Sequence, residues 1–137
     1  MIPAKTFLVA STSAAQRPDS RIYVIFADNA RAKSALRTAV AHARGLDMQI
    51  ELLVAHVTPF PLPLEEPPVS LDFMERAMSE LVADIDGAVL VSILLCRDSD
   101  EALRKAVGPE SLVVIPVGMP KLARLLAADG HRLMVIH

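Results

Sequence analysis

The chain has 137 residues, 53% of them hydrophobic, and its formal net charge is −2 at pH 7. This length is typical of one domain with its own core. No apolar stretch reaches the roughly 18 residues of a membrane-spanning helix, and the near-neutral charge gives no basic surface of the kind that binds nucleic acid. We therefore expect a single folded domain, with neither nucleic acid nor a membrane as its partner.

The first twenty residues show no clear periodicity. Residues 7–10 are a brief apolar run, too short for the hydrophobic region of a secretory signal, and residues 11–20 are rich in small and polar side chains. We predict that residues 1–20 form a mobile N-terminal tail, with a leader peptide as the alternative. Residues 21–137 are predicted to form a single α/β domain.

Five short apolar runs, rich in β-branched residues, are typical of strands that are buried on both faces. They occupy residues 22–27, 50–57, 88–95, 112–117 and 132–136. Between them, apolar residues recur at intervals of three and four, which predicts amphipathic helices. These stripes fall in residues 32–43, 74–85, 102–107 and 122–126.

Residues suited to helix starts precede these stripes. Asp28, Ser70 and Asp98 have side-chain oxygens that can accept hydrogen bonds from free helix amides, and Pro120 suits a first helical position. The polar face of the first helix is predicted to be solvated; its basic residues are Arg31, Lys33, Arg37 and Arg44.

Residues 58–69 contain five prolines and predict an extended loop, because proline lacks an amide donor and fixes φ. Its apolar side chains either pack back on the domain or meet a partner.

Alternation of buried strands with amphipathic helices predicts an α/β fold with an open five-stranded parallel sheet, covered by helices on both faces. Right-handed crossovers favour the strand order 3-2-1-4-5. Ligands of such sheets bind beyond the carboxyl ends of the strands, where the order reverses. Here that crevice is predicted to lie between Ala27, Asp28 and Asn29 on one rim and the segment 116–119 on the other.

The last connection is short. Residues 118–130 begin and end with glycine and separate the final two strands by thirteen residues. A parallel crossover needs about a dozen residues, usually a helix. Almost none remain for a glycine-rich loop around a phosphate.

Four stretches together resemble the universal stress protein family. They are residues 22–28 (IYVIFAD), 35–45 (ALRTAVAHARG), 51–57 (ELLVAHV) with the proline-rich loop, and 112–118 (LVVIPVG). The resemblance covers roughly residues 21–137 and implies the fold of adenine nucleotide alpha hydrolase-like proteins. It also implies homodimers joined through the last strand, Arg132–Ile136.

In ATP-binding members of that family, an aspartate that ends the first strand lies near the adenosine, and Asp28 matches it. A turn after the fourth strand and a longer glycine and serine/threonine loop hold the phosphates. Gly118 matches part of that turn, but Pro116 stands where its first glycine is expected and no later Gly-Ser or Gly-Thr pair exists. Lys121 could meet an anion at the helix start. The alternatives are a helix cap for Asp28, a turn residue for Gly118 and a solvated side chain for Lys121.

No other chemistry stands out. The four histidines show no metal-ligand spacing with cysteines or carboxylates, and the chain contains no nucleophile elbow, P-loop or dinucleotide fingerprint. The single cysteine, Cys96, ends a buried strand and reads as a small hydrophobic residue. One cysteine cannot form an internal disulfide, which favours a reducing cytoplasm. We predict no catalytic residues and no metal.

Three functions compete. The first is a non-catalytic, universal-stress-type domain without ATP that acts through dimerisation and protein association; its last strand would be a sheet edge with one charge and no proline. The second is an adenine-nucleotide sensor, binding ATP or AMP through Asp28, Gly118 and Lys121. The third is a nucleotide hydrolase or transferase, which would need a base and a charge-stabilising cluster in one crevice.

Overall fold

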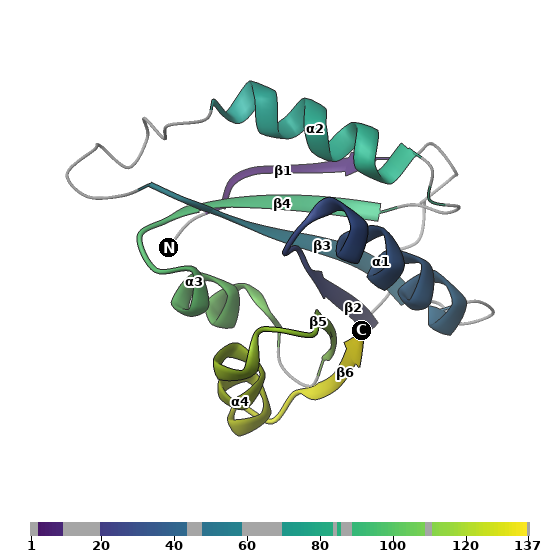
Figure 1. The fold of residues 1–137 in the computed structure, drawn as a ribbon, viewed down its shortest axis with the longest axis vertical. Coiled ribbons are helices and arrows are strands. Elements are labelled where there is room, and N and C mark those ends of the chain that lie inside the picture. Colours follow the sequence, from purple (N-terminus) through teal and green to yellow (C-terminus); the bar gives the residue numbers. More distant parts are fainter. Residues whose placement is uncertain are drawn as a thin grey trace.

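The computed structural model describes residues 3–9, 20–43, 48–58, 70–83, 85, 89–108 and 111–136. Within them, strands and helices alternate after an initial pair of strands (Figure 1). The strands are β1 (Pro3–Val9), β2 (Ser20–Ile25), β3 (Met48–Val57), β4 (Val89–Cys96), β5 (Leu112–Pro116) and β6 (Arg132–Ile136). The helices are α1 (Asn29–Ala43), α2 (Leu71–Ala83), α3 (Ser99–Ala106) and α4 (Pro120–Ala128).

The predicted sheet is confirmed. The strands lie in the order β1-β4-β3-β2-β5-β6, and the five from β4 to β6 are mutually parallel. Counted from β2, these five follow the order 3-2-1-4-5. The order reverses beside β2, the strand from which the chain winds first toward β4 and then toward β6.

The prediction of a tail over residues 1–20 is corrected for part of its length. Pro3–Val9 forms β1, which pairs antiparallel with the outer edge of β4, and β2 already begins at Ser20. Residues 10–19 lie outside the described part of the chain. The sequence gives little sign of β1 because its partner lies some eighty residues further along, and pairing at such a distance leaves no local period to detect.

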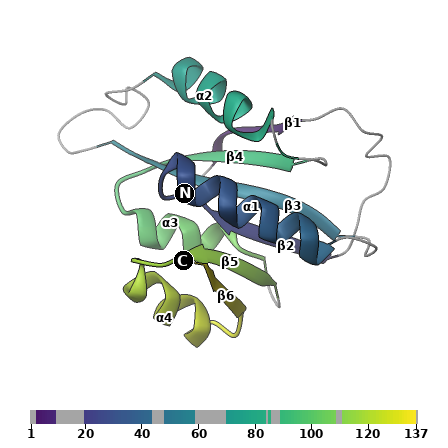
Figure 2. The same ribbon diagram turned by 45° about the vertical axis from the view of Figure 1, so that its right-hand side comes forward.

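Two helices cover each face of the sheet, and each pair encloses its own core. Figures 1 and 2 show α1 and α2 over one face and α3 and α4 over the other. The first core joins α1 and α2 to alternate residues of the strands, such as Ile22, Val24 and Leu52. The second joins α3 and α4 to their neighbours Tyr23, Ile25 and Leu53. Successive strand residues thus serve opposite cores, which explains their unbroken apolar runs.

The helix starts follow the predicted capping residues. The Asp28 side chain accepts from the Arg31 amide at 2.8 Å, Ser70 Oγ from the Phe73 amide at 3.2 Å, and Asp98 from the Glu101 amide at 3.2 Å. Pro120 stands at the start of α4. These bonds satisfy amides that have no partner inside the helix. The starts predicted for three helices are therefore confirmed.

The proline-rich segment 59–69, the basic residue Arg44 and the terminal His137 lie outside the described residues. Within the described ranges, no helix has the combination of length and apolar character that a membrane span requires.

Candidate functional site

The crevice predicted at the switch point begins where β2 and β5 part. These strands pair only from Ile22 to Val24 on β2 and from Leu112 to Val114 on β5. Beyond that point the chain after β2 stays with β3, because the Phe26 amide donates to the Leu53 carbonyl at 3.0 Å. The carboxyl ends of the two strands therefore diverge, which is the usual origin of a ligand crevice in a doubly wound sheet.

Asp28 lies on one rim of this crevice, and both of its carboxylate oxygens have partners. Oδ1 caps α1 through the Arg31 amide, and Oδ2 lies 3.6 Å from Nε of the Arg31 side chain. The side chains of Asp28 and Arg31 are both about half exposed. The cap predicted for Asp28 is thus present, and the same carboxylate also holds the first turn of α1 together.

Arg31 connects the two rims. Besides its ion pair with Asp28, its Nη1 donates to the Val117 carbonyl at 3.3 Å, across from α1 to the turn after β5. The sequence placed Arg31 on a solvated helix face, and its side chain is indeed half exposed; the structure adds that the same side chain reaches the turn after β5. Its position three residues after the capping aspartate was the available signal, since residues three apart lie on the same side of a helix.

Gly118 forms the opposite rim. Its φ is +102°, in the left-handed region that side chains other than glycine rarely adopt. A Cβ placed there would lie 3.4 Å from Arg31 Nη1. Asp28 and Gly118 are therefore brought together as the sequence suggested, with the Arg31 guanidinium between them.

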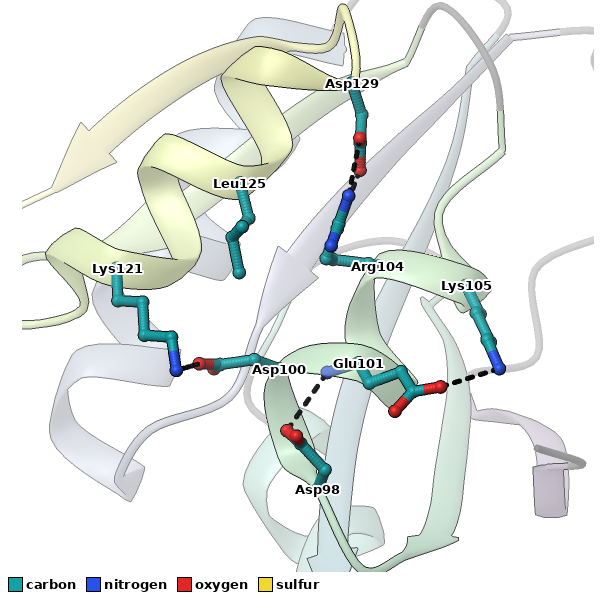
Figure 3. A pocket seen from close by; sticks show the side chains of 8 residues that line it. All are labelled: Asp98, Asp100, Glu101, Arg104, Lys105, Lys121, Leu125 and Asp129. Atoms are coloured by element: carbon teal, nitrogen blue, oxygen red, sulfur yellow. Dashed lines mark hydrogen bonds and ion pairs between the residues drawn. The ribbon is translucent and has the colours of Figure 1, made fainter.

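Lys121 does not join this group. Its ammonium lies 3.9 Å from Asp100 Oδ2, so its side chain extends from α4 toward α3 (Figure 3). Lys121 is largely exposed, with 75% of its side-chain surface accessible. It lines a cleft of about 510 Å³ between α3 and α4, whose walls carry seven charged side chains and Leu125.

The charges of this α3–α4 cleft are mostly matched with one another. Arg104 donates to Asp129 through Nε at 3.0 Å and Nη2 at 2.8 Å, and Lys105 lies 2.8 Å from Glu101. Hydrogen bonding to Arg104 and the charge of that guanidinium hold the pKa of Asp129 below its usual value, although partial desolvation opposes the shift. The same bond raises the pKa of Arg104. Two of these ion pairs, Arg104 with Asp129 and Lys121 with Asp100, connect α3 to α4 and the residue that follows it.

Three other titratable residues, Cys96, His56 and His131, lie in strands or next to them. Burial, with a smaller contribution from the charge of Asp98, raises the pKa of the Cys96 thiol, so the thiol remains protonated. His56 is buried at the end of β3, and His131 precedes β6. Across the part of the chain that the structure describes, no group of three or more histidine, cysteine, aspartate or glutamate side chains is arranged to hold a metal ion.

The second feature that the sequence singled out, the last strand, forms one edge of the sheet. β6 pairs with β5 in an unbroken parallel register, and no other strand in the described part of the chain pairs with it. Leu133, Met134 and Ile136 are only partly buried, and Val135 is 48% exposed. The inner strands, by contrast, bury nearly all their apolar side chains. This edge therefore has an outer side that no described strand pairs with, and an apolar surface that is partly exposed.

Comparisons of the chain with protein-family models, with curated proteins and with solved structures found no significant match.

Proposed function

We propose that this chain is a universal-stress-protein-like domain that acts through dimerisation and protein association, without catalysis and without a requirement for ATP. Its first partner is a second copy of itself, joined along β6. The observation that carries this proposal is the state of that edge: among the strands that the structure describes, β6 is the outermost and pairs with β5 alone, and its Val135 is half exposed.

An edge strand presents a row of unpaired amides and carbonyls, which another strand can extend. Soluble proteins commonly blunt such an edge with proline, lysine or a bulge, and β6 has none of these. Its one charge, Arg132, stands at its start. A strand of this kind is better suited to pairing than to remaining solvated.

Pairing with a second copy also suits the order of its side chains. If two β6 strands run antiparallel in full register about Met134, Leu133 lies opposite Val135 of the second copy. Arg132 then lies opposite Ile136, so the two arginines are not placed against each other. The contact is self-complementary, as a twofold interface must be.

Light scattering coupled to size exclusion tests this directly. We expect a mass near 30 kDa, twice the 14.8 kDa of the chain. Val135→Lys should return the protein to the monomer, because in this register each new lysine lies opposite Leu133 of the second copy and diagonal to the other new lysine. Phe73→Lys is the matched control: it changes another exposed apolar residue, on α2, and should leave the mass unchanged. A monomeric parent chain at micromolar concentration would contradict the proposal.

A second candidate, an adenine-nucleotide sensor, is favoured by one observation. The Arg31 guanidinium lies between Asp28 and the left-handed turn at Gly118, at the end of the sheet where nucleotides commonly bind. A nucleotide would have to take over the bonds that Arg31 now makes to Asp28 and Val117. Its phosphates would gain the guanidinium, which binds phosphate through paired hydrogen bonds.

Thermal unfolding with millimolar ATP or AMP decides between the candidates, because a ligand of the native state raises the Tm. Arg31→Gln should remove any rise if the guanidinium binds phosphate. Asp28→Asn keeps an oxygen that can cap α1, so it serves as a better probe of the carboxylate than alanine. An unchanged Tm with both nucleotides removes the sensor candidate and leaves the association proposal in place.

An enzyme would need more than the crevice supplies. A hydrolase or transferase requires a base and groups that stabilise developing charge around one reacting atom. At the crevice, the carboxylate of Asp28 already accepts from the Arg31 amide and pairs with the Arg31 side chain. The Lys121 ammonium points away from it, toward Asp100 of α3. We therefore propose no catalytic role for these residues.

We also propose that the protein works in a reducing cytoplasm, because its single cysteine is buried and forms no disulfide.

A further inference from the structure

The two edges of the sheet differ in how they are protected. β1 and β6 lie at opposite edges in both views (Figures 1 and 2), and within the described ranges each is hydrogen-bonded to one neighbouring strand. A domain with two open edges can pair through both of them and so build an open chain of molecules. Whether association ends at two copies therefore depends on the second edge.

β1 carries features that β6 lacks. Pro3 has no amide to donate, and the sequence of β1 includes a lysine, Lys5. The pairing is also irregular between them: Pro3 pairs with Leu94 and Lys5 with Ile93, so two steps along β1 match one step along β4. Such a bulge twists an edge away from further pairing. In both views α2 runs alongside β1 as well.

β1 also covers a strand that would itself associate readily. β4 has the sequence VLVSILLC, with no charge, no proline and only one polar residue, Ser92. Short segments of this composition, when exposed at an edge, are typical sites of intermolecular β pairing. Without β1, the sheet would end at β4.

We propose that β1 is a guard strand: it covers the aggregation-prone edge of β4, and its own proline, lysine and bulge prevent further strand addition. Association then has only one free edge available, β6, and stops at a closed pair. This inference rests on the proposed association through β6. It adds a reason why that association stops at two copies.

The test removes the guard features without removing the strand. In the full chain, Pro3→Val/Lys5→Val restores an amide and removes a charge within β1. Light scattering should show particles larger than 30 kDa, with a mass that rises from micromolar to near-millimolar concentration. Adding Val135→Lys to this double variant should limit it to pairs, because only the β1 edge remains available. Arg124→Leu, on the exposed side of α4, controls for the general loss of a surface charge.

The outcomes separate the two proposals. If the parent chain is a dimer and Pro3→Val/Lys5→Val has the same mass at every concentration, β1 is not a guard and the association through β6 still stands. If the parent chain is a monomer and the double variant associates, the guard is supported and the β6 dimer is wrong. Growth of the Arg124→Leu control to the same size as the double variant would also overturn the guard, because the effect would then not depend on the edge.

Discussion

Arg21 and Glu51 form an ion pair whose two members differ greatly in exposure. Arg21 Nη1 lies 2.6 Å from Glu51 Oε1, but 45% of the arginine side chain is exposed, against 9% of the glutamate. Ser92 Oγ donates to the other carboxylate oxygen at 2.7 Å. The three residues come from β2, β3 and β4, so a buried charge is stabilised by the two strands on either side of it.

This inequality predicts an unequal response to mutation. Arg21→Met should lower the free energy of unfolding by about 2 kcal/mol, because it leaves a buried carboxylate with one neutral partner. Glu51→Gln should cost less than about 1 kcal/mol, since the amide can still bond Ser92 and the freed arginine is already half solvated. Urea unfolding of both variants measures the difference, with Arg21→Met/Glu51→Gln as the closing member of the cycle. Equal losses in the two single variants would contradict this description of the pair.

Asp129 predicts a pH-dependent link between α3 and α4. Its pKa is lowered in the folded protein, so its contribution to stability is fully present above the unfolded pKa of about 3.9 and is lost as the pH falls through the lower folded value. Asp129→Asn should therefore have a lower Tm than the parent chain at pH 6. The gap should narrow as both are acidified below about pH 4. If the Tm difference between Asp129→Asn and the parent chain stays constant with pH, the loss of stability is steric and does not come from the Asp129 charge.

Two glycines with similar backbone angles should respond alike to substitution. Gly118 has φ +102° and Gly130 has φ +92°. A Cβ added at Gly118 would lie 3.4 Å from Arg31 Nη1, the end of a flexible side chain, and a Cβ added at Gly130 would meet no atom within 4 Å. Gly118→Ala and Gly130→Ala should therefore each cost about 1–2 kcal/mol of unfolding free energy, because both residues have left-handed backbones. Chemical denaturation of the two variants checks this; a clearly larger loss at Gly118 would show that Arg31 also crowds the added Cβ.

Cys96 should be unreactive in the native protein. Its side chain is fully buried and its thiol pKa is raised, chiefly by that burial, while the thiolate is the form that reacts. At pH 8 a disulfide reagent such as 5,5′-dithiobis(2-nitrobenzoate) should label Cys96 only as fast as the protein opens, and at once in denaturant. Rapid labelling of the folded chain would show that the end of β4 is accessible.

The sequence by itself determined the architecture of the parallel sheet. Each of the five strands is a local apolar run, and three of the helix starts depend on a capping side chain three residues before its amide partner. Such signals lie within a few residues of one another, so they can be read without knowing the fold. Right-handed crossovers then restrict the strand order to very few possibilities.

The tertiary structure decided what depends on residues far apart in the chain. The sequence could place Asp28 and Gly118 at one crevice, because both follow strands that end at the same side of the sheet. It could not show that Arg31 would reach Val117, that Lys121 would turn to Asp100, or that Pro3–Val9 would pair with β4. Side-chain direction and edge pairing are settled only when the packed elements bring distant atoms within a few ångströms, and no local pattern encodes that distance.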